Sequence, residues 1–115
     1  MAKRGTHNGR YILDGKIPVP CEDLLTWARW IEDHWQDRVV GRDQVGPREV
    51  STVFLGLDHT WHDDIPPRLF ETMVFLWQGD ERTVEDDAPM WRTPTWEMAL
   101  ETHAEGIVWA RERLD

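Results

Sequence analysis

The segment Leu69-Phe70-Glu71-Thr72-Met73-Val74-Phe75-Leu76-Trp77 decides the fold class. Only two of its residues, Glu71 and Thr72, are polar, and prolines and a glycine bound the segment on its two sides. A short, nearly continuous apolar run between such breaks is typical of a strand inside a sheet. We therefore predict that residues 69–77 form a central strand.

Weaker strand patterns surround this run. Residues 11–13 form a short strand pattern closed by Asp14-Gly15, and the prolines at 18 and 20 keep residues 17–20 extended. Residues 38–40 and 49–55 predict a hairpin with a long connection through Gly46-Pro47, and residues 90–92 a short edge strand. Residues 56–67 and 78–89 are expected to be loops, the second of them acidic.

Two amphipathic helices are expected, one between the early strand patterns and one after the last of them. The first covers residues 22–36. The second has Thr93 as its N-cap and Pro94 as its first residue, and extends to about residue 113. Each carries one apolar stripe at three- and four-residue spacing. The stripes consist of Leu24, Trp27, Ala28, Ile31 and Trp35, and of Trp96, Ala99, Leu100, His103, Ile107, Ala110 and Leu114.

These elements predict the α+β class, with an antiparallel sheet of about four strands and both helices packed on one face. The 115 residues suit one domain, which we place at residues 11–115. Residues 1–10 are polar and are expected to form a flexible N-terminal arm.

The amino-acid composition limits the classes of function that are expected for this protein. The single cysteine, Cys21, excludes an internal disulfide, and no apolar stretch approaches a membrane span, so a cytoplasmic protein is expected. The formal net charge is −9, and residues 21–115 hold 21 acidic residues against nine basic ones. Such a body disfavours nucleic acid and anionic membranes and favours a basic protein partner.

Three stretches resemble a family of small proteins encoded by bacteriophages and prophages. They are Tyr11-Ile12-Leu13-Asp14-Gly15-Lys16 with residues 18–28 after it, Val50-Ser51-Thr52-Val53-Phe54-Leu55-Gly56-Leu57-Asp58-His59, and Pro66-Pro67-Arg68-Leu69-Phe70-Glu71-Thr72-Met73. That family has no assigned activity. The resemblance therefore implies a phage-type accessory protein in a bacterial cell and assigns no catalytic residue.

Two sets of residues could carry chemistry. Asp58, His59 and His62 lie close enough in sequence to share a divalent metal, but they lack a matching second ligand pair, so no metal or other cofactor is expected. Glu71 and His103 are polar intruders in apolar stripes. A buried pair between them could act as an acid and a base, or could be a satisfied core interaction.

The leading hypothesis is a non-enzymatic protein-binding module, because eight tryptophans exceed what a small core needs. Trp61 lies in a polar loop and Trp109 is rotated away from its helical stripe, so both are expected at a partner surface or a homo-oligomer contact. The alternative is a metal-dependent or acid–base enzyme that uses residues 58–64 with Glu71 and His103.

Overall fold

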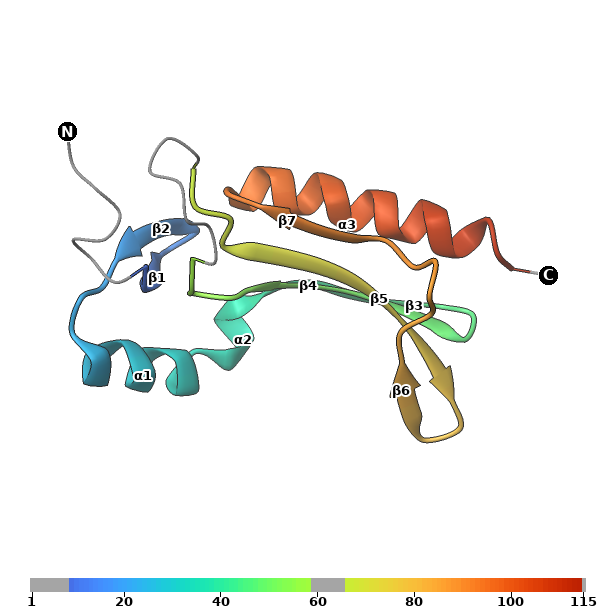
Figure 1. The fold of residues 1–115 in the computed structure, drawn as a ribbon, viewed down its shortest axis with the longest axis horizontal. Helices are drawn as coiled ribbons and strands as arrows, with labels where there is room; N and C mark the ends of the chain where they lie inside the picture. Colours follow the sequence, from blue (N-terminus) through green and yellow to red (C-terminus); the bar gives the residue numbers. More distant parts are fainter. Residues whose placement is uncertain (1–8, 59–65, 115) are drawn as a thin grey trace.

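The computed structural model describes residues 9–58 and 66–114 of the chain (Figure 1). Its elements are β1 (Tyr11–Asp14), β2 (Ile17–Pro20), α1 (Leu24–Asp33), α2 (Trp35–Arg38), β3 (Val39–Val45), β4 (Arg48–Phe54), β5 (Phe70–Gln78), β6 (Glu81–Thr83), β7 (Met90–Thr93) and α3 (Trp96–Arg111). Strands β3 to β7 form one antiparallel sheet, and β1 pairs with β2 in a separate hairpin. The predicted α+β class with an antiparallel sheet is confirmed, although the sheet has five strands and the hairpin adds two more.

The prediction for the apolar run is confirmed, because β5 is internal. It pairs with β4 along one edge and with both β6 and β7 along the other. Its side chains alternate between the two faces, so that Phe70, Thr72 and Val74 are buried whereas Met73 and Phe75 are only partly buried. Both faces of β5 are apolar, and helix α3 covers one of these two faces.

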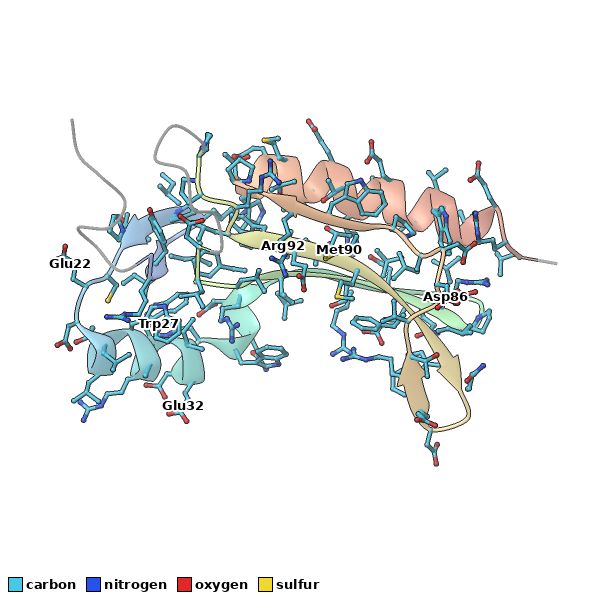
Figure 2. All side chains as sticks on the ribbon, in the orientation of Figure 1. Glu22, Trp27, Glu32, Asp86, Met90 and Arg92 are labelled. Atoms are coloured by element: carbon cyan, nitrogen blue, oxygen red, sulfur yellow. The ribbon has the colours of Figure 1, made fainter. Side chains whose placement is uncertain are left out.

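Strands β6 and β7 are two parts of one interrupted strand. Both are antiparallel to β5, and β6 pairs with residues 76–78 while β7 pairs with residues 70–73. The six residues 84–89 leave the sheet between Thr83 and Met90 (Asp86 marks this excursion in Figure 2). The expected acidic loop at residues 78–89 therefore contains a strand, and its acidic part is shorter than predicted.

The β3–β4 hairpin is tighter than expected. Residues 41–44 continue β3 up to Val45, and only Gly46 and Pro47 separate the two strands. Gly46 has a positive φ of 58°, which glycine adopts without strain. The predicted long connection is wrong because these residues belong to an edge strand, where polar side chains are common.

Helix α3 lies along one face of the sheet (Figure 1). Its contact side is made of small residues, and a Cβ on Gly106 would lie 2.8 Å from Val50 Cγ1, so the helix packs directly on the strands. Its N-cap is Thr95, whose hydroxyl accepts a hydrogen bond from Met98 N at 3.1 Å. The predicted cap at Thr93 is wrong, because Thr93 ends β7 and its carbonyl accepts a bond from Leu69 N.

Helix α1 packs at the end of the sheet beside β1, whereas α3 packs along a face of the sheet. Trp30 meets the ring of Phe54 edge-on at 5.9 Å, and the Trp27 indole donates to the carbonyls of Tyr11 and Gly56. The predicted helix over residues 22–36 is interrupted at His34, the C-cap of α1.

Four residues assigned to apolar core stripes are about half exposed, namely Leu24, Trp35, Leu100 and Leu114. None of the helices in the described part of the chain has both the length and the apolar character needed to cross a membrane.

Candidate functional sites

A buried chain of polar side chains connects the sheet to α3. His103 Nε2 lies 2.6 Å from Asp43 Oδ2, and His103 Nδ1 lies 2.8 Å from Thr52 Oγ1. From Thr52 the hydroxyls continue to Thr72 at 2.7 Å and to Thr102 at 2.8 Å. We call these five residues the polar network; it joins β3, β4, β5 and α3.

The direction of the hydrogen bonds follows from the last member of the network. Thr102 donates to the carbonyl of Ala99 at 3.1 Å, and a carbonyl can only accept. Since each hydroxyl has one proton, Thr72 then donates to Thr102, and Thr52 donates to Thr72. The oxygen of Thr52 then faces His103 Nδ1, and His103 Nε2 faces the Asp43 carboxylate.

The order Asp43, His103, Thr52 has the connectivity of a hydrolytic triad, but its burial argues for a structural role. A nucleophile must reach a substrate, whereas Thr52 is 0% exposed beneath α3. Asp43 is the accessible end, with 54% of its side chain exposed. The network therefore satisfies buried polar groups and fixes α3 on the sheet.

The hypothesised Glu71–His103 pair does not form. Glu71 and Thr72 are neighbours on β5 and point to opposite faces of the sheet. Thr72 belongs to the polar network, whereas Glu71 binds Arg92 of β7 at 3.0 Å on the other face. The sequence identified His103 as a buried polar residue, but its carboxylate partner is Asp43.

The hypothesised metal site falls mostly outside the described residues. His59, His62 and Trp61 lie there, and Asp58 is half-buried and donates its backbone N–H to the carbonyl of Gly9 at 2.7 Å. Within residues 9–58 and 66–114, no three His, Cys, Asp or Glu side chains converge in a way that could hold a metal ion. Arg10, at the end of the predicted flexible arm, forms a bridge with Leu57.

The outer side of α3 borders an apolar groove of about 400 Å³. Pro89 and Trp91 form one wall, and Ala104, Val108 and Trp109 form the other. We call this the α3–β7 groove. Trp109 is partly buried and packs against the core cluster that contains Val74 and Ala110.

Stacking arginines hold the Trp109 ring in place. The guanidinium of Arg113 lies 3.8 Å from the ring centroid, and that of Arg48 lies 5.6 Å away. Arg48 is itself fixed by two hydrogen bonds to Glu85, and these bonds lower the pKa of Glu85 below its usual value. Trp109 is thus a rigid aromatic wall of the groove.

Acidic and apolar residues alternate along the outer side of α3. Val108 is 54% exposed and Leu100 49%, one on each side of Ala104 in an i, i+4, i+8 row. The neighbouring helical row carries Glu97, Glu101, Glu105 and Glu112, of which Glu105 and Glu112 line the α3–β7 groove. This surface is therefore apolar with an acidic rim.

The sheet face opposite α3 holds a second groove, of about 380 Å³. Its floor is formed by Val53, Met73 and Phe75, and its sides by Trp35, Arg42 and Arg82. We call this the sheet groove. It lies between α2 and the β5–β6 hairpin, which both extend to this side of the sheet (Figure 1).

A buried carboxylate lies beside the sheet groove. Glu49 accepts hydrogen bonds from Arg42 at 2.8 Å and from the Trp77 indole at 2.9 Å, and Arg82 is 3.7 Å away. Burial by itself would raise the pKa of Glu49, but the hydrogen bonds from Arg42 and Trp77 and the charges of Arg42 and Arg82 outweigh it and hold the pKa below its usual value.

Comparison with protein families, with characterised proteins and with solved structures gives no significant match to this chain. The functional argument therefore depends on the geometry of these surfaces and on the resemblance noted in the sequence.

Proposed function

We propose that the chain is a phage-type accessory protein that acts by binding another protein, and that the α3–β7 groove is its binding surface. The observation that carries this proposal is an apolar groove with tryptophan walls, Trp91 and Trp109, on a helix whose outer side carries four glutamates. Tryptophan is enriched at the centres of interfaces, where a rigid apolar ring excludes water at little entropic cost.

The glutamates around the groove favour a basic partner. Glu105 and Glu112 lie at its edge, and Glu97 and Glu101 continue the acidic row along α3. A second copy of this acidic chain would be repelled there, whereas lysine or arginine would be attracted. The occupant we propose is a partner segment with large apolar side chains flanked by basic residues, such as a basic amphipathic helix.

A synthetic amphipathic helix of leucine and lysine provides the test. Its affinity for the full chain is measured by calorimetry, beside a peptide in which glutamate replaces every lysine. We expect the lysine peptide to bind, with an affinity that falls as salt is added, and the glutamate peptide not to bind. Equal binding of both peptides would show that charge does not select the partner.

Two valines provide a matched pair of variants that separates the groove from the rest of the acidic surface. Val108 in the groove is 54% exposed and Val84, outside it, is 50% exposed. We expect Val108→Asn to weaken binding of the lysine peptide about tenfold, because the contact of a valine side chain contributes about 1.5 kcal/mol. Val84→Asn should leave the affinity unchanged. Equal effects of the two variants would place binding elsewhere.

A further inference from the structure

The sheet groove is lined by side chains from four elements that the strand register brings onto one face. Arg42 pairs with Ser51 and Ser51 with Met73, so these three residues form one row across β3, β4 and β5. Side chains alternate along β5, so Phe75 and Trp77 lie on the same face as Met73. Arg82 of β6 pairs with Trp77 and lies on this face as well. Trp35 of α2, with about half of its surface exposed, closes the end of the groove.

In the ion pairs beside this groove the guanidinium groups are more exposed than the carboxylates, although the protein as a whole is acidic. Of the side chains that form ion pairs here, Arg42 is 53% exposed and Arg82 is 41% exposed, whereas their shared partner Glu49 is 5% exposed. The neighbouring pair repeats the pattern, with Arg92 at 34% and Glu71 at 15%. In each pair the guanidinium is more exposed than the carboxylate, and the Glu49 carboxylate is buried.

One carboxylate cannot neutralise two guanidinium groups. In the described part of the chain, Arg42 and Arg82 share Glu49, and Glu71, which also lines the groove, pairs with Arg92, so three guanidinium groups face two carboxylates there. Arg82 also lies 3.9 Å from the centroid of the Phe75 ring, and this stacking fixes the guanidinium at the groove wall. Outward-facing donors therefore remain available next to an apolar floor.

We propose that the sheet groove binds a small organic anion, a carboxylate attached to an apolar or aromatic body. The carboxylate lies between Arg42 and Arg82, and the apolar body lies on Val53 and Met73 against Trp35. The volume of about 380 Å³ is within the range of small-molecule sites, and a methionine floor adapts to ligands of different shape.

Two other occupants fit less well. Stacking of nucleic-acid bases would need open aromatic faces, but Arg82 covers Phe75 and Arg38 lies 5.2 Å from the centroid of the Trp35 ring. The net charge of −9 also repels a phosphate chain. An organic cation would meet the exposed guanidinium groups before it reached the carboxylates. The site is independent of the α3–β7 groove, because the sheet separates the two.

The test uses 4-phenylbutyrate as the anionic probe and 4-phenylbutylamine as its cationic counterpart. Each is titrated into the full ¹⁵N-labelled chain, and the amide and indole signals are followed. We expect saturable shifts with phenylbutyrate at Ser51, Met73 and the Trp35 indole, with a dissociation constant of about 1 mM, ordinary for a ligand of this size. The amine should produce no saturable shift.

Three variants test which charged side chains bind the carboxylate of the probe. Arg82→Gln should weaken phenylbutyrate binding about fivefold, the loss expected for one partly exposed ion pair, and Glu49 keeps its bonds to Arg42 and Trp77. Ser51→Asp adds a carboxylate to the groove without removing an ion pair, and should abolish saturation. Arg111→Gln, on the exposed side of α3, is the matched control and should bind as the original chain does.

Several results would overturn the proposal. They are the absence of saturation with phenylbutyrate, equal binding of the amine, shifts centred on Trp109 instead of Trp35, or full affinity in the Ser51→Asp variant. Signal dispersion in the same spectra shows whether each variant is folded, so a loss of binding by misfolding is recognised directly.

Discussion

Thr72→Val tests whether the polar network holds α3 on the sheet. Valine has nearly the shape of threonine, so the change removes one hydroxyl and opens no cavity. That hydroxyl is 2.7 Å from Thr52 Oγ1 and 2.8 Å from Thr102 Oγ1, at the centre of the network. Its loss leaves the Thr52 proton without an acceptor in a residue that is 0% exposed.

The expected cost follows from this geometry. A buried polar group left without a partner costs about 1–3 kcal/mol. Thr102 keeps its bond to Ala99, so most of the penalty comes from Thr52, and we expect the free energy of unfolding to fall by about 2 kcal/mol. For a chain of 115 residues this corresponds to a fall in Tm of about 8 °C.

Urea unfolding followed by circular dichroism measures this difference, with an unchanged m-value showing that two-state unfolding is retained. Thr83→Val is the matched control, because among the described residues its hydroxyl bonds only the Leu76 carbonyl, at 3.2 Å, in a partly exposed strand. The control should lose less than half as much stability. If Thr72→Val lies within about 0.5 kcal/mol of the original chain, the network does not stabilise the fold as argued.

Three further changes test other contacts. Gly106→Ala should lower the free energy of unfolding, measured with urea, by about 1–2 kcal/mol, because the new Cβ would lie 2.8 Å from Val50 Cγ1. This cost exceeds the gain from the better helix propensity of alanine. No loss of stability would mean that α3 is not in direct contact with the sheet. The difference in free energy of unfolding between the original chain and Glu49→Gln should have its full size above pH 4.5 and should shrink as the pH falls below that value. The reason is that the pKa of Glu49 is lower in the folded chain than its ordinary value of 4.5. A difference that does not change with pH would contradict this. Trp27→Phe should cost about 1–2 kcal/mol in the same assay, since its indole donates to two backbone carbonyls, and a neutral effect would mean that these bonds do not fasten α1.

Local patterns predicted the elements that are apolar and missed those that are polar. The run at residues 69–77 gave β5 correctly, because an internal strand must be apolar. Residues 41–44 were assigned to a connection, because the charged side chains of an edge strand resemble those of a loop. The helix start was misplaced by two residues, since Thr93-Pro94-Thr95 offers two threonines and the proline precedes the true cap, Thr95.

The residues that come together at each site are set by the pairing register of the strands, and local sequence patterns do not encode this register. The polar network requires Thr52 to lie opposite Thr72, a pairing set by the β4–β5 register across a connection of 15 residues. The same register separates Glu71 from His103. A threonine in each of two adjacent apolar strands, together with a histidine on a helical apolar stripe, was the only sequence signal for the network.

The excursion between β6 and β7 makes part of this chain suitable for engineering. Thr83 and Met90 are held independently by their pairing with β5, so the register on each side does not depend on the length of residues 84–89. Loop length has a weak effect on closure entropy. A foreign peptide inserted after Asp86, beyond the anchor that Glu85 makes with Arg48, would be displayed from a rigid sheet while both of its flanking strands stayed in place.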